Sequence, residues 1–142
     1  MKPEIPVDSL SATRRQHRWT GLALAGLVPL GLYSKVYAGP TATWVNNSLG
    51  GLFYVLFWCL LVFWLLPRAR PWRIALAVLA VTCLLEFMQL WHPTWLEWLR
   101  SFWIGQVLLG TTFAWSDFPY YFLGAGLGWL WLQRFRPAMA DR

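Results

Sequence analysis

Four long apolar runs, separated by short polar or charged stretches, make up most of this chain. They cover residues 19–37, 48–66, 72–91 and 116–136, and a segment of mixed character separates the last two. An apolar run of about 20 residues crosses the hydrocarbon of a bilayer as a helix, because each residue advances the helix by about 1.5 Å. The pattern therefore predicts an all-α integral membrane protein with four transmembrane helices.

The segment between the third and fourth runs has the spacing of an amphipathic helix. Its polar residues repeat on one helical face and its large apolar residues fall mostly on the other, so we expect it to lie in the membrane interface or to re-enter the bundle. The oppositely charged pair Glu97 and Arg100, three residues apart, can interact locally. The polar face carries Thr94, Glu97, Arg100 and Ser101, and the apolar face Trp95, Leu99, Phe102 and Trp103.

Composition agrees with lipid surroundings. Hydrophobic residues make up 58% of the chain and charged residues 13%, whereas soluble domains carry about a quarter charged residues. Most of the 12 tryptophans fall near predicted helix ends or in the outer loop, which is typical of aromatic belts at membrane interfaces. We expect membrane lipids around the protein, predict no cofactor, and leave a bound lipid or pigment open.

The net charge of +6 is distributed unevenly across the predicted membrane. With alternating helices, ten Lys and Arg residues fall on one side, and only Lys35 and Arg100 fall on the other. An excess of Lys and Arg marks the cytoplasmic side. The charge is thus explained by topology and not by nucleic-acid binding. It predicts a multi-pass protein of the cytoplasmic or an internal membrane, with cytoplasmic tails at 1–18 and 137–142 around a membrane domain at 19–136.

A polar stripe on the third predicted helix is the first candidate site. Thr82, Glu86 and Gln89 stand at i, i+4 and i+7 and share one face. A charged residue within a span costs about 2.5–3.5 kcal/mol and usually faces a partner in the bundle interior. Lys35, Arg100 and His92 are the candidate partners. Glu86 is then either a tie between helices or part of a functional site.

Other patterns indicate helix packing and give no support for a metal site or a catalytic nucleophile. Small residues four apart, as at Gly21 and Ala25 or Gly124 and Gly128, allow helices to approach closely. His17 and His92 fall on opposite sides of the predicted membrane, and the two cysteines have no ligand neighbours, so no metal site is predicted. The absence of a nucleophile motif favours a protein that is not an enzyme.

Three motifs carry a resemblance to a known family: "EFMQLW" with Glu86 and Gln89, "LLGTTFAWSD" with Asp117, and "YFLGAGLG" with Tyr121. The chain resembles a bacterial membrane family known only as domain of unknown function 2809 and, more distantly, VanZ-like proteins. The stripe on the third helix, the candidate partners of Glu86 and these motifs together predict a polar cluster within the membrane. Its members are Lys35, Thr82, Glu86, Gln89, Arg100, Asp117 and Tyr121.

Two departures from that family bear on function. Gly51 stands where the family usually has an aspartate, and Gln106 stands where an arginine is common. The loss of two polar residues favours a non-catalytic accessory or scaffolding subunit, with other integral membrane subunits as its partners. The alternative is a small membrane enzyme, or a protein that handles lipid or glycan headgroups at the outer leaflet. It would act through Glu86, Gln89, Arg100 and Asp117.

Overall fold

The computed structural model describes residues 7–135, and within them every regular element is helical. The tail predicted at 137–142 lies outside the described residues. The elements follow in the order α1 (Val7–Val36), α2 (Ala42–Trp44), η1 (Val45–Leu49), α3 (Gly50–Leu65), α4 (Pro71–Met88), α5 (Thr94–Ser101), α6 (Trp103–Leu109), η2 (Trp115–Asp117) and α7 (Phe118–Phe135).

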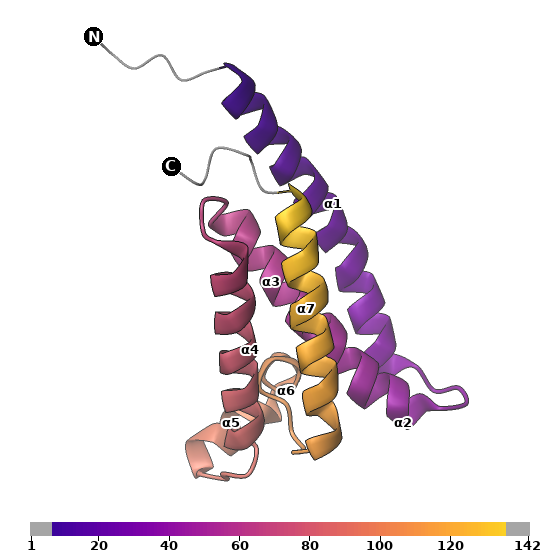
Figure 1. Cartoon of the computed structure of the whole chain (residues 1–142). Coiled ribbons are helices and arrows are strands. Elements are labelled where there is room, and N and C mark those ends of the chain that lie inside the picture. The colour runs from indigo at the N-terminus through magenta and orange to yellow at the C-terminus, as the bar shows by residue number, and fades with distance from the viewer. Residues whose placement is uncertain (1–6, 136–142) are drawn as a thin grey trace.

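The four long helices α1, α3, α4 and α7 form a bundle (Figure 1). α7 packs against α3 and α4, and α1 packs against α3. Both ends of the described chain lie at one end of the bundle, together with the turn between α3 and α4 (Figure 1). We call this the terminal end. The opposite end, the α5–α6 end, carries α2, α5 and α6.

Two helical stretches are long and apolar enough to cross a membrane. They are the continuous helix of α2, η1 and α3, Ala42–Leu65, and the helix α4, Pro71–Met88. α1 and α7 are not among them: α1 contains Pro29 and Lys35, and glycines, aromatic residues and Arg134 lower the hydropathy of α7. The all-helical prediction is confirmed for the described residues, whereas two of the four predicted spans have the hydropathy of a spanning helix.

Two predicted segments differ in detail from the structure. α1 begins at Val7, so the segment predicted as a polar tail is helical well before residue 19. The predicted amphipathic helix ends at Ser101, because Phe102 has an extended backbone (φ −87°, ψ 143°) and the chain reverses there into α6. The reversal brings Gly105 against the carbonyl of Leu99, where any side chain would collide.

The interior changes character along the bundle. Toward the terminal end the core shared by α3, α4 and α7 is apolar and includes Cys59, Phe63, Ile74 and Leu132, while α1 buries the polar residues Gln16 and Thr20 there. Toward the α5–α6 end most of the buried side chains are polar, whereas the outward faces of the long helices carry exposed leucine and aromatic side chains. The buried polar residues at this end include Ser34, Ser48, Thr82, Glu86, Gln89 and Asp117.

Glycines allow close contact between α3 and α7. A Cβ atom at Gly124 would lie 2.7 Å from the Leu52 carbonyl oxygen, and one at Gly128 would lie 2.8 Å from Cβ of Cys59. The other predicted packing pair has no such contact. A Cβ at Gly21 would be 3.8 Å from the nearest atom, and Ala25 is exposed. Close helix approach in the described residues is therefore found at the pair in α7.

Candidate functional site

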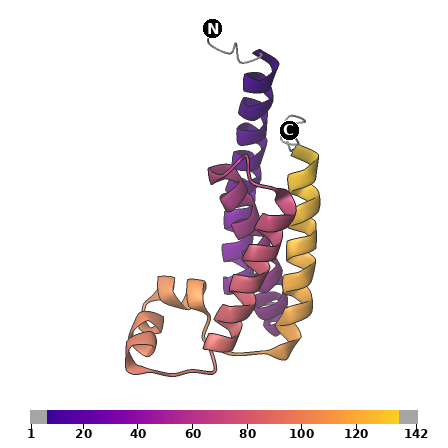
Figure 2. The ribbon, with the colours of Figure 1, turned by 60° about the vertical axis from the view of Figure 1, so that its left-hand side comes forward.

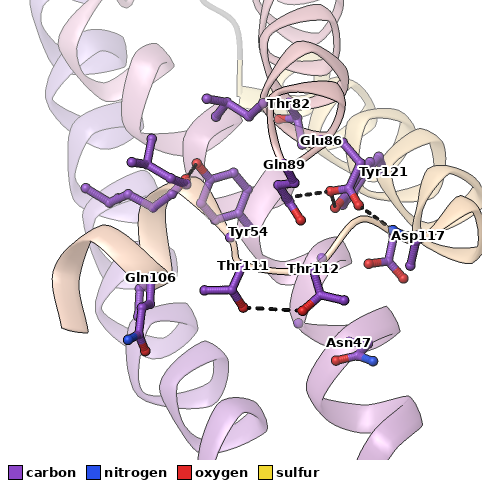
Figure 3. Close-up of a pocket in the computed structure, with 18 of the residues that line it drawn as sticks. Asn47, Tyr54, Thr82, Glu86, Gln89, Gln106, Thr111, Thr112, Asp117 and Tyr121 are labelled. Atoms are coloured by element: carbon purple, nitrogen blue, oxygen red, sulfur yellow. Dashed lines mark hydrogen bonds between the residues drawn. The ribbon is translucent and has the colours of Figure 1, made fainter. Parts of the chain in front are cut away.

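A polar cavity of about 230 Å³ lies at the α5–α6 end, between α3, α4, α7 and the segment 106–112 (Figure 3). The fold brings six of the seven residues of the predicted polar cluster to its wall, from three separate helices and the turn before α7. The pattern along one helix could indicate only the stripe on α4. The six residues are Lys35, Thr82, Glu86, Gln89, Asp117 and Tyr121.

Glu86 is the centre of the hydrogen bonds in this cavity, and only 2% of the residue is exposed. Its Oε1 accepts a hydrogen bond from the backbone N–H of Ala114 at 2.9 Å. Its Oε2 accepts one from the Tyr121 hydroxyl at 2.6 Å and one from the Gln89 amide at 3.0 Å (Figure 3). Both oxygens are therefore engaged, and the carboxylate ties α4 to α7 and to the loop before η2.

Two glycines make room for this arrangement. A Cβ at Gly51 would lie 2.7 Å from Cε1 of Tyr121, so the tyrosine ring occupies the space that a side chain on α3 would need. Gly110 has a φ of +68°, which glycine adopts without steric cost, and the amide of Gln89 packs against its Cα. Position 51 thus has no room for a side chain, because an aromatic ring fills the space beside it.

Lys35 and Asp117 are the charged groups at the cavity that remain available to a ligand. The Lys35 ammonium donates to the carbonyl of Asn46 at 2.9 Å, which uses one of its three donors. Asp117 is 8% exposed, and its Oδ1 accepts a long hydrogen bond of 3.4 Å from Ser116. Neither residue forms an ion pair within residues 7–135. The cavity therefore carries one cation and two carboxylates, those of Asp117 and Glu86, and none of the three forms an ion pair within residues 7–135.

Gln89 adds an unpaired acceptor. Its amide nitrogen donates to Glu86, which leaves the amide oxygen buried and without a hydrogen-bond partner in the described part of the chain. A buried acceptor without a partner costs about 1–3 kcal/mol. Since Gln89 lines the cavity, a bound group that donates hydrogen bonds would satisfy this oxygen. The Thr82 hydroxyl, by contrast, has a hydrogen-bond partner, because it donates to the carbonyl of Val78 at 2.8 Å.

Arg100 does not line the cavity and does not reach Glu86. The side chain is buried against the end of α4, where it donates to the carbonyls of Met88 at 3.1 Å and Trp91 at 3.2 Å. A cation at a helix C-terminus satisfies the last carbonyls and interacts favourably with the helix dipole. Arg100 also pairs with Glu97 at 3.3 Å. It therefore fixes the corner between α4 and α5.

His92, the third candidate partner of Glu86, contacts Glu97 instead, at 2.7 Å on the surface. This hydrogen bond lowers the pKa of Glu97. The groups that do bind Glu86 include the N–H of Ala114, which an analysis of side-chain patterns misses because every residue except proline offers this donor. Tyr121 could be found through the family motif.

The site has the character of a binding cavity. It is far larger than the roughly 10–15 Å³ that a single water needs, so it has room for a group of several non-hydrogen atoms. Within residues 7–135, no group of three or more His, Cys, Asp or Glu side chains could hold a metal ion. The side chains that face the cavity instead offer an ammonium group, a carboxylate, hydroxyls and an amide oxygen.

No solved structure matches the chain. The model of a family described as "Protein of unknown function (DUF2809)" matches residues 41–125. The match spans α3, α4, α5, α6 and the first part of α7, and thus includes Glu86 and its three hydrogen-bond donors. The chain belongs to the DUF2809 family of proteins of unknown function.

Proposed function

We propose that this protein is a four-span membrane protein that binds a charged, headgroup-sized molecule in the cavity at its α5–α6 end. The observation that carries the proposal is the pair Lys35 and Asp117, which line one cavity without ion-pair partners in the described chain. A cavity with a few convergent polar groups is the usual form of a small-molecule site. Because both oxygens of Glu86 are engaged, its role is to position the cavity wall.

The distribution of side chains supports a membrane location. Leu22 on α1, Leu84 on α4 and Phe122 on α7 are each at least 60% exposed, while Glu86 and Asp117 are buried. Large exposed apolar surfaces are rare on soluble monomers. A helix bundle in lipid, by contrast, turns its polar residues inward. This argument extends the spanning role to α1 and α7, whose own hydropathy is lower.

The distribution of charge supports an orientation. In the described chain, basic residues gather near the terminal end, on the first part of α1, the α3–α4 turn and the end of α7. Lys35 and Arg100 lie toward the α5–α6 end. By the positive-inside rule the terminal end is cytoplasmic, and the cavity is near the outer membrane surface. The basic residues at the terminal end are Arg14, Arg15, Arg18, Arg68, Arg70, Arg73 and Arg134.

Cysteine labelling tests this orientation. In a chain whose Cys59 and Cys83 are replaced by alanine, we expect Ser101→Cys to react with a membrane-impermeant maleimide in intact spheroplasts. Arg68→Cys should react only after lysis, because it lies on the α3–α4 turn at the opposite end of the bundle. The cysteine-free chain is the blank. Equal labelling of both positions in intact spheroplasts, or the reverse order, contradicts the proposal.

Native mass spectrometry of the full chain, purified from membranes in mild detergent, tests binding. We expect the wild-type chain to carry a small-molecule or lipid adduct, and Lys35→Gln and Asp117→Asn to retain about tenfold less of it. The reason is that a hydrogen bond to a charged group contributes about 1.5–3 kcal/mol, and about 1.4 kcal/mol corresponds to a factor of ten.

Matched controls for this experiment remove exposed charges away from the cavity. Arg134→Gln and Glu97→Gln change exposed side chains that do not line it, so both variants should retain the adduct. Circular dichroism of each variant checks that the helices persist. A wild-type chain without an adduct, or equal retention by all variants, rules out the proposed binding role.

A role as an accessory subunit of a larger membrane assembly is the second candidate. The observation that favours it is the α5–α6 pair, which stands to one side of the four long helices (Figure 2). Its exposed face is aromatic, with Trp95, Trp98 and Trp103 each more than half exposed. Such rings suit a contact with another subunit as well as the membrane interface. The same purification would favour this role if a stoichiometric integral membrane subunit replaced the small-molecule adduct.

A further inference from the structure

A second cavity, an apolar groove of about 270 Å³, lies between α1, α3 and α6. Apart from Lys35 and the ring of Tyr54, the side chains along it are apolar. Among the described residues that line it are Leu27, Gly31, Phe53, Phe57, Trp58 and Trp103.

The groove adjoins the polar cavity. Five residues line both, namely Lys35, Gly50, Tyr54, Val107 and Leu108. The Tyr54 hydroxyl donates to the Leu108 carbonyl at 2.8 Å, which holds α6 against α3 at this boundary. Gly50 leaves space for the Lys35 ammonium, because a Cβ there would lie 3.0 Å from Nζ. The chain thus has a cation at the junction of an apolar space and a polar one.

We propose that the occupant of both cavities is a phospholipid with an amine in its headgroup, an inference that rests on the proposed binding function. Its phosphate binds Lys35 at the junction, and one acyl chain lies in the groove between α1 and α3. Its ammonium group extends into the polar cavity. There it donates to the Asp117 carboxylate and to the unpaired amide oxygen of Gln89.

The charges favour this class of ligand over its competitors. A neutral glycan headgroup would bring no charge to Lys35 or Asp117, which attract each other but are too far apart to form an ion pair. A purely anionic headgroup would satisfy Lys35 but would bring a negative charge toward Asp117 and Glu86, which line the same cavity. A soluble zwitterion would match the polar cavity but leave the groove without a role. An amine-bearing phospholipid satisfies all three features.

Titration of defined probes into the delipidated full chain in detergent tests the inference. The probes are dioleoyl phosphatidylethanolamine, dioleoyl phosphatidylglycerol and soluble glycerophosphoethanolamine, which is the same headgroup without acyl chains. We expect the first to bind at least about tenfold more tightly than either of the others. The lipid without the amine loses the hydrogen bonds to Asp117 and Gln89, and the soluble headgroup loses the apolar burial.

A substitution that blocks the groove distinguishes the contribution of the acyl chain to binding from that of the headgroup. Gly31→Leu places a side chain in the groove, and its Cβ would be at an ordinary 3.8 Å from Phe53. We expect it to weaken phosphatidylethanolamine binding about tenfold or more and to leave glycerophosphoethanolamine binding unchanged. Gly26→Leu is the matched control, because it makes the same change on α1 where nothing lies within 4 Å and no groove residue is altered. Val28→Trp blocks the groove from a second position.

The outcomes distinguish this inference from the proposed function. If glycerophosphoethanolamine binds as tightly as the lipid, and Gly31→Leu and Val28→Trp have no effect, the lipid assignment is overturned while headgroup binding stands. The assignment is also overturned if phosphatidylglycerol binds as tightly as phosphatidylethanolamine. If no probe binds, and Lys35→Gln retains as much of the co-purified adduct as the wild-type chain, the proposed binding function itself fails. The assignment is also overturned if another polypeptide, and no lipid, co-purifies with the chain and occupies the groove.

Discussion

Replacement of Glu86 by alanine is expected to lower the free energy of unfolding in detergent by about 3–5 kcal/mol. The substitution removes the acceptor of three hydrogen bonds and leaves the N–H of Ala114, the Tyr121 hydroxyl and the Gln89 amide without their partner. These donors come from α4, α7 and the loop before η2, so their loss loosens the cavity wall on two sides. Unfolding by sodium dodecyl sulfate, followed by circular dichroism, measures the change.

Two further variants define the cause of this loss. Glu86→Gln keeps one acceptor oxygen and should retain part of the stability, whereas Glu97→Gln removes an exposed carboxylate and should leave stability close to that of the wild-type chain. Equal stability of Glu86→Ala and the wild-type chain would show that the three hydrogen bonds do not hold the bundle together. The predicted role of Glu86 as a tie between helices would then be wrong.

A methyl group added at Gly124 is expected to destabilise the bundle by about 1–3 kcal/mol. The new Cβ would lie 2.7 Å from the backbone carbonyl oxygen of Leu52 and 3.1 Å from Cβ of Val55. A backbone atom cannot turn aside as a flexible side chain can, so α7 and α3 have to separate. Because α7 also carries Tyr121, this separation should weaken the hydrogen bond to Glu86 as well. The same detergent unfolding experiment measures the loss.

Gly126 provides a matched control on the same helix. A Cβ there meets nothing within 4 Å, so Gly126→Ala should be neutral or stabilise α7 by up to about 1 kcal/mol through its higher helix propensity. The two substitutions are chemically identical and lie two residues apart. Destabilisation by both would point to a general need for flexibility in α7 and against close packing at Gly124.

The helices can be predicted from the sequence because the length and composition of each apolar run indicate the length of the helix and whether it is surrounded by apolar groups. The runs at 48–66 and 72–91 correspond to α3 and α4, and the mixed segment after them is helical as predicted. The reversal at Phe102 was not predicted. It depends on the contact between Gly105 and the carbonyl of Leu99, and the helical periodicity of the segment carries no sign of it.

The candidate site was predictable in membership but not in its contacts. Burial of an acid among apolar residues requires partners, so the stripe of Thr82, Glu86 and Gln89 indicated an interior polar cluster. Neither of the predicted partners Lys35 and Arg100, however, hydrogen-bonds to Glu86. Arg100 satisfies the end of α4, and Lys35 donates to Asn46 at the cavity edge. The partner of a buried group is the donor that the packed bundle places within about 3 Å of it, and periodicity along one helix carries no information about that distance.

By itself the sequence determined the helical class of this protein, the segments that carry its basic residues, the apolar runs of its helices, and the face of α4 that turns inward. Each of these follows from periodicity and composition, which act within one helix. The tertiary structure alone decided that Tyr121 and the Ala114 backbone hold Glu86, and that Lys35 and Asp117 face one cavity. It also decided that an apolar groove opens beside Lys35. These features depend on how closely α1, α3 and α7 approach, and glycines such as Gly51 and Gly124 set that distance.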